Sequence, residues 1–82
     1  MAQYLGVHNM GGAASTEAME SSWESYKEAC DKRGCKALHV HLNAETGRAF
    51  CITEASSASE VQAAHDDASL EVKEIVEVTL AE

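Results

Sequence analysis

The stretch from residue 37 to residue 55 carries the strongest structural signal in the chain. Its sequence is ALHVHLNAETGRAFCITEA. Apolar residues alternate with other types on both sides of a polar centre, a pattern typical of two strands that each have one apolar face. The segment 43–48, which contains Gly47, has the composition of a turn. The rest of the chain is therefore expected to fold around a β-hairpin.

The alternation also predicts which hairpin side chains share a face. We expect one face to carry the large apolar residues, which are Leu38, Val40, Leu42, Phe50 and Ile52. His39 and His41 then lie on the opposite face. Because facing positions of a hairpin share a face, Cys51 is expected on the histidine side. Two imidazoles and a thiol on one side of a sheet are the strongest indication of chemistry in the sequence.

A helix is predicted on each side of the hairpin. Ser15 is a favourable N-cap for the first helix, and Gly34 is a favourable residue at its C-terminal end. The apolar stripe of this helix consists of Met19, Trp23, Tyr26 and Cys30. Ser57 and Glu60 have the spacing of a capping box, so a short second helix is expected to begin there.

Two further strands are predicted over residues 3–8 and 72–80. The order strand, helix, strand, strand, helix, strand is that of the ferredoxin-like fold, an α+β architecture with two helices on one face of an antiparallel sheet. A single domain over residues 1–82 is expected at this length. We expect the helices to cover Leu5, Val7 and the apolar hairpin face. The residues expected on the open face are Tyr4, His8, His39, His41 and Cys51.

His39 and His41 form the centre of a candidate metal site. Residues two apart on a strand have Cα atoms roughly 6.5–7 Å apart, so these two imidazoles can converge on one ion. Imidazole suits nickel, zinc and copper, and a thiolate adds affinity for softer ions. His8 and Cys51, expected on neighbouring strands of the same face, complete the predicted ligand set. The alternative is a set of polar residues on a wet or dimeric surface.

Other residues with metal-binding or nucleophilic side chains carry weaker signals. His65 shares the small apolar side of the second helix and is followed by two aspartates, a pattern of a surface cation site or of a solvated helix face. Cys30 is expected to be a core thiol, and its spacing from Cys35 is not that of a CxxC pair. Cys51 and a histidine could act as nucleophile and base, but no third orienting group is recognisable. We therefore expect a binding protein and not an enzyme.

The charge and size of the chain restrict its partners and compartment. With 14 acidic and 6 basic residues the net charge is −8, which disfavours nucleic-acid binding. No stretch is apolar enough to cross a membrane or to form a signal peptide, and three cysteines are an odd number, so we expect a cytoplasmic protein with free thiols. A chain of 82 residues builds a thin core, which favours a homodimer.

The hairpin resembles a known protein family. Residues 38–39 (Leu-His) and 50–55 (FCITEA) are similar to segments of a family of small bacterial proteins of unassigned function. That family resembles dimeric ferredoxin-like α/β-barrel proteins and includes a nickel-binding protein. The similarity extends over residues 4–78, from Tyr-Leu to Ile-Val-Glu-Val at its end.

Matches and departures within this resemblance bear on the metal. His39 and Cys51 fall where the family often has His and Cys, whereas His41 falls where an aromatic residue is more usual. Other departures are Ala37 for a Trp, Gly11 and Gly12 for a Pro-Gly pair, and Ser56 for a Pro. The unusual His41 creates the His-x-His pair and so favours the nickel-binding member.

The resemblance implies a homodimer that binds nickel for sequestration, buffering or detoxification, with zinc or copper as alternatives to nickel. A small enzyme or a small-ligand module of the dimeric α/β-barrel type is the alternative function. A purely structural interaction domain is a third interpretation. An apolar pocket that holds an organic ligand would favour the enzyme or small-ligand module. Tight binding in a metal titration would favour the nickel-binding protein.

Overall fold

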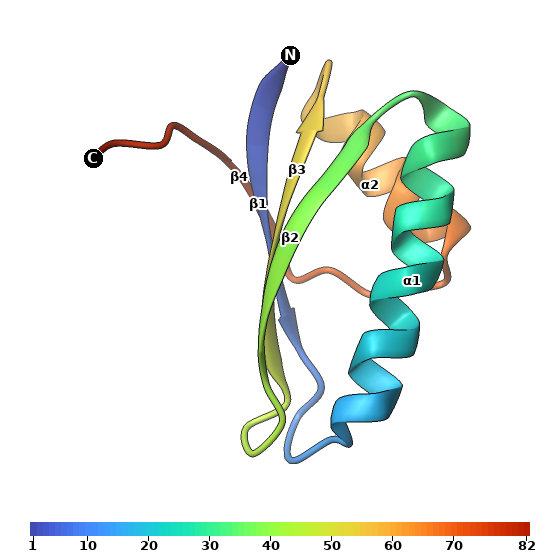
Figure 1. The fold of residues 1–82 in the computed structure, drawn as a ribbon, viewed down its shortest axis with the longest axis vertical. Coiled ribbons are helices and arrows are strands. Elements are labelled where there is room, and N and C mark those ends of the chain that lie inside the picture. The colour runs from blue at the N-terminus through green and yellow to red at the C-terminus, as the bar shows by residue number, and fades with distance from the viewer.

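The computed structural model describes residues 1–82 and contains the predicted order of elements. These elements are β1 (Ala2–Asn9), α1 (Thr16–Arg33), β2 (Lys36–Asn43), β3 (Arg48–Ala55), α2 (Ala58–Asp67) and β4 (Glu74–Val78). The strands form one antiparallel sheet in the order β2-β3-β1-β4. Both helices lie on the same side of this sheet, and the other side is uncovered (Figure 1). The predicted ferredoxin-like fold is confirmed.

All three predicted helix caps are present. The Ser15 side chain accepts a hydrogen bond from the backbone N–H of Ala18, at 3.0 Å. Gly34 has a left-handed backbone with φ of 79°, a conformation that glycine adopts at little cost, and α1 ends there. Ser57 accepts a hydrogen bond from the backbone N–H of Glu60 at 3.2 Å, which fixes the start of α2. These local signals therefore set the helix boundaries that the sequence predicts.

The chain leaves α2 through a tight turn that returns it to β1. Ser69 is left-handed, with φ of 58°, and the Leu70 N–H donates to the carbonyl of His65 at 2.9 Å. The Lys73 N–H then donates to the carbonyl of Val7 at 2.7 Å. This connection occupies the first residues of the segment predicted as the last strand, so β4 is shorter than residues 72–80.

The assignment of faces from the sequence is wrong for two of the strands. The register pairs Val40 with Cys51 and Leu42 with Ala49, and paired residues share a face. Cys51 therefore lies on the helix side with Val40, and not with the two hairpin histidines. A one-residue difference in parity reverses every side chain of a strand. The open face of β1 and β3 accordingly carries Leu5, Val7, Phe50 and Ile52.

The packing of the core explains this parity. Tyr26 and Met19 of α1 are almost fully buried, at 1% and 2% exposure. The β3 residues that face the helices are small, namely Ala49, Cys51, Thr53 and Ala55. The Tyr26 hydroxyl also forms a 2.6 Å hydrogen bond with the Thr53 hydroxyl. Large helix side chains thus fill the space that small sheet residues leave.

The central part of the uncovered side of the sheet is apolar. Four strands contribute to this open sheet face, which we define by Leu5, Val7, His39, His41, Phe50, Ile52, Val76 and Val78. Val76 is 37% exposed there, and the others are half-buried or, in the case of the two histidines, exposed. Neither helix of the protein combines the length and the apolar character that crossing a bilayer requires.

Candidate metal centre

Three side chains from different elements converge between the sheet and α2. His8 extends from β1, Cys51 from β3 and His65 from α2. The two histidine Nε2 atoms are 3.3 Å apart. The Cys51 Sγ atom lies 3.5 Å from Nε2 of His8 and 3.7 Å from Nε2 of His65. We refer to these three residues as the His-Cys-His cluster.

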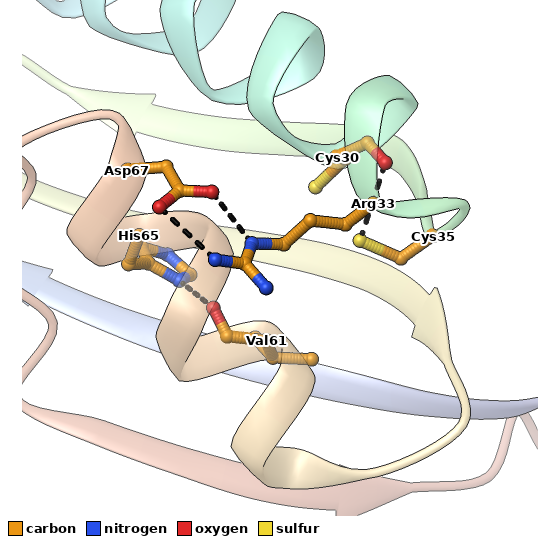
Figure 2. Close-up of polar contacts among 6 residues, drawn as sticks. All are labelled: Cys30, Arg33, Cys35, Val61, His65 and Asp67. Atoms are coloured by element: carbon orange, nitrogen blue, oxygen red, sulfur yellow. Dashed lines mark hydrogen bonds and ion pairs between the residues drawn. The ribbon is translucent and has the colours of Figure 1, made fainter.

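Backbone hydrogen bonds fix how the two imidazoles are protonated. Nδ1 of His65 lies 2.8 Å from the carbonyl oxygen of Val61 on the preceding turn of α2 (Figure 2). Nδ1 of His8 lies 2.9 Å from the carbonyl oxygen of Glu71. Because a carbonyl oxygen only accepts hydrogen bonds, each Nδ1 carries the proton and each neutral Nε2 presents a lone pair. Metal-binding histidines are held in this way, by donation from the other ring nitrogen to a carbonyl.

Burial keeps the cluster uncharged at neutral pH. Loss of solvent lowers the pKa of His65 to about 4, against the opposing hydrogen bond to Val61. Burial also lowers the pKa of His8, which its bond to Glu71 opposes. The pKa of the Cys51 thiol is raised to about 11 by burial. At pH 7 a single thiol proton therefore faces two nitrogen lone pairs, and metal binding requires only that this one proton leaves.

Gly6 makes room for the cluster. It pairs with Cys51 across β1 and β3, so both residues point toward the helices. A Cβ atom at Gly6 would lie 2.7 Å from Sγ of Cys51 and 3.6 Å from Cε1 of His65. The first distance is well inside van der Waals contact. The absence of a side chain at residue 6 therefore allows the sulfur and the imidazole to meet.

Contacts from α1 hold His65 in place. The ring of Tyr26 packs against the His65 imidazole at a centroid distance of 4.2 Å, and the ring of His8 lies 5.0 Å away. Near the ends of both helices, the Arg33 guanidinium donates two hydrogen bonds to the Asp67 carboxylate (Figure 2). This ion pair holds the pKa of Asp67 below its usual value and fastens the end of α2, two residues after His65.

The spacing of the three donor atoms fits a four-coordinate ion. Bond lengths of about 2.05 Å to nitrogen and 2.3 Å to sulfur, at tetrahedral angles, place donors roughly 3.3 Å apart for N–N and 3.6 Å for N–S. Right angles in an octahedron would give roughly 2.9 and 3.1 Å with the same bond lengths. The observed separations of 3.3, 3.5 and 3.7 Å match the tetrahedral values. The donors and their spacing therefore suit an N₂S metal site.

The sequence-predicted site residues fall into two groups. His8 and Cys51 lie together on the helix side, as part of the cluster. His39 and His41 project from the open sheet face, with ring centroids 5.4 Å apart. The expectation that all four residues share one face is wrong, because the sheet separates the pairs. Metal binding by the His39–His41 pair stays a prediction.

His65 is the cluster residue whose sequence pattern carries the weakest signal. Its neighbours in the sequence, two aspartates, suggested a solvated surface, yet its side chain is 1% exposed. The signal that could have identified it is its helical spacing from Val61 on the buried side of α2. A buried histidine needs polar partners, and those of His65 come from Val61 on its own helix and from His8 and Cys51 on β1 and β3.

Comparison with known proteins identifies the family. Residues 4–78 match the family model described as "Nickel responsive protein SCO4226-like". The chain belongs to this family. Its structure is similar to the crystal structure of SCO4226 from Streptomyces coelicolor A3(2), with a TM-score of 0.89 and 21% sequence identity over 99% of this chain and 100% of the other. At that identity the likeness shows a shared fold. No curated protein matches the chain.

The contact between Gly6 and Cys51 can be tested with a double-mutant cycle. Gly6→Ala is expected to lower the free energy of unfolding by about 1–3 kcal/mol, the typical cost of overpacking a core, because the new methyl group displaces Sγ. Cys51→Ala removes the sulfur, so Gly6→Ala should cost less in that background. Urea unfolding of the four proteins measures the coupling. An equal cost in both backgrounds would show that the sulfur does not fill this space.

Acid is expected to destabilise the ion-free protein through the buried histidines. Their pKa values are lowered in the folded state, whereas an unfolded chain has histidine pKa values of about 6.5. Below pH 6.5 the unfolded chain therefore binds more protons, and the free energy of unfolding falls as the pH falls toward about 4. Urea unfolding across this range measures the decline. His65→Gln should show a shallower decline, and equal slopes in the two proteins would contradict the effect of burial.

Proposed function

We propose that this protein binds a transition-metal ion at the His-Cys-His cluster and serves to sequester or buffer nickel. One observation carries the proposal: both imidazoles commit Nδ1 to backbone carbonyls and direct Nε2 lone pairs toward each other and toward a thiol. A cation bound here would take the place of the thiol proton between the sulfur and the two nitrogen atoms. The donors by themselves also suit zinc and copper. The family description supplies the reason to choose nickel.

The ion is cargo in this proposal, and the site suits reversible loading. His8 is only partly buried, so the cluster lies close to the surface. The ion displaces the proton of Cys51, since a coordinating thiol is deprotonated. The net charge of −8 raises the concentration of cations near the surface. Detoxification of excess nickel is consistent with such a role.

Catalysis is the weaker alternative because the thiol is not activated. A nucleophilic cysteine needs a lowered pKa, whereas burial raises that of Cys51 to about 11. The neighbouring imidazoles have lowered pKa values, so they do not form the imidazolium that would stabilise a thiolate. These features support binding of an ion and not the covalent chemistry of a cysteine enzyme.

We also propose that two copies of the chain associate through the open sheet face. Its apolar side chains come from β1, β3 and β4, and Val76 on the edge strand β4 is 37% exposed. A second copy would bury this apolar surface, which favours association at roughly 25 cal/mol per Å². A two-fold axis would bring the same residues of both copies together. The His39–His41 pairs would then lie at or near the interface.

Replacement of cluster ligands is expected to abolish tight nickel binding. His8→Gln, His65→Gln and Cys51→Ser each remove one donor atom. Loss of an outer hydrogen bond to a metal ligand lowers metal affinity about 10–100-fold, and we expect loss of the ligand itself to lower nickel affinity by more than that. Isothermal titration calorimetry at pH 7.5 measures the affinity, and zinc and copper can be ranked in the same way. Unchanged nickel affinity in His65→Gln would place the ion elsewhere.

The matched control is the double variant His39→Ala with His41→Ala. These side chains lie on the other face of the sheet, so the tight site should persist. If the histidine pair binds a further ion, the double variant loses one weaker site from the titration. Loss of the tight site in this control would contradict the proposal and assign nickel to the His39–His41 pair.

The dimer is tested by placing a charge on the open sheet face. Ile52→Asp should give monomers, because a buried unpaired carboxylate is costly and each subunit is already acidic. Ser25→Asp adds the same charge at an exposed position of α1 and should leave the dimer intact. Light scattering at micromolar concentration reports the mass. A wild-type protein that is monomeric there would count against the interface.

A further inference from the structure

An apolar pocket lies between α1 and the sheet. Its volume is about 40 Å³, and nine of its eleven lining residues are hydrophobic. Met10 and Leu42 belong to its outer part, since they are 50% and 36% exposed. Met19 and Tyr26 are buried and form its inner part. The space admits a few non-hydrogen atoms and excludes a drug-sized ligand.

The pocket leads to the His-Cys-His cluster from one side. His8 and Cys51 line it, whereas His65 does not and is 1% exposed. Three donors with tetrahedral spacing leave a fourth position at the ion. His8 and Cys51 therefore line both the cluster and the pocket. A small ligand in the pocket would lie beside these two donors of the cargo ion.

The pocket wall offers little to a charged or strongly hydrated ligand. Apart from His8, its polar lining residue is Ser22, and no carboxylate, amide or cationic side chain takes part. A divalent ion bound to the Cys51 thiolate keeps one positive charge. Buried net charge is costly in apolar surroundings, so an anionic donor on an apolar body is favoured over water. A second sulfur donor also matches the softness of the first.

We propose that a small aliphatic thiol enters this pocket and completes the coordination of the ion as a thiolate. Its S–H bond breaks as its sulfur bonds to the ion, the proton passes to solvent, and no oxidant or reductant is needed. The hydrocarbon part then lies against the apolar wall between Leu42 and Met19. This inference rests on the proposed function, and it names the chemical class of a second ligand at the same site.

Cobalt(II) is a suitable probe, because its visible absorption is stronger in four-coordinate than in six-coordinate sites. The wild-type protein is loaded with one equivalent of cobalt and titrated with ethanethiol. We expect saturable new sulfur-to-cobalt absorption, with cobalt retained on the protein during gel filtration. Ethanol, which lacks the sulfur, and thioglycolate, which adds a carboxylate, should each give less than about a tenth of the response at equal concentration, because the apolar wall cannot satisfy a carboxylate.

Two variants test the route through the pocket. Leu42→Trp fills its outer part, and should bind cobalt as the wild type does but respond weakly to ethanethiol. Leu80→Trp adds the same ring at a position that is 73% exposed and does not line this pocket, so it should respond fully. A full response in Leu42→Trp would overturn the assignment to this pocket.

The remaining outcomes separate the two proposals. Cobalt binding to the cluster without a response to ethanethiol would overturn the thiol ligand and leave the metal-binding function intact. Removal of cobalt from the protein by the added thiol would also overturn the thiol ligand and leave the metal-binding function intact. Loss of the wild-type spectrum in Met19→Leu would assign the fourth position to the protein's own thioether. Failure of the cluster to bind cobalt, nickel or zinc would overturn both proposals.

Discussion

The small residues of β3 that face the helices are the constraint on which the rest of the structure depends. Ala49, Cys51, Thr53 and Ala55 leave a deep space above the sheet. Tyr26 and His65 fill this space, and the two aromatic rings pack together at 4.2 Å. The same parity turns Leu5, Val7, Phe50 and Ile52 outward, so the buried cluster and the apolar outer surface have one cause. Gly6 extends the arrangement to the neighbouring strand.

Local patterns were sufficient to predict the architecture but not the faces of the sheet. Ser15, Gly34 and Ser57 act within a single helical turn, and their signals gave the correct element order. The alternation of apolar residues predicted the wrong faces for β1 and β3, because the size of the apolar side chains did not decide which face of these strands packs against the helices. Packing against the helices decided it, and favoured Cys51 over its larger neighbours. That preference depends on residues far away in the sequence and cannot be read from one strand.

The residues of the candidate site could likewise be predicted only in part from the sequence. His8 and Cys51 were predicted as ligands, and the structure places them together, although on the face opposite to the one expected. His65 lies 57 residues from His8 and 14 from Cys51 along the chain. No short motif connects residues at such separations, and the turn at Ser69 that positions the partner carbonyl of His8 is equally hard to foresee. The His39–His41 motif was prominent because its two residues are close in sequence.

The wide separation of the cluster residues along the chain has a consequence for the stability of the protein if the proposed ion binds. Donor atoms from β1, β3 and α2 meet only when the sheet and α2 are assembled, so an ion held there stabilises the folded state alone. If the proposed ion binds there, empty copies would open more often than loaded ones, and a protease would cleave the open form. The amount of the protein would then rise with the supply of the ion even at a constant rate of synthesis. Turnover would in this way match binding capacity to the amount of ion.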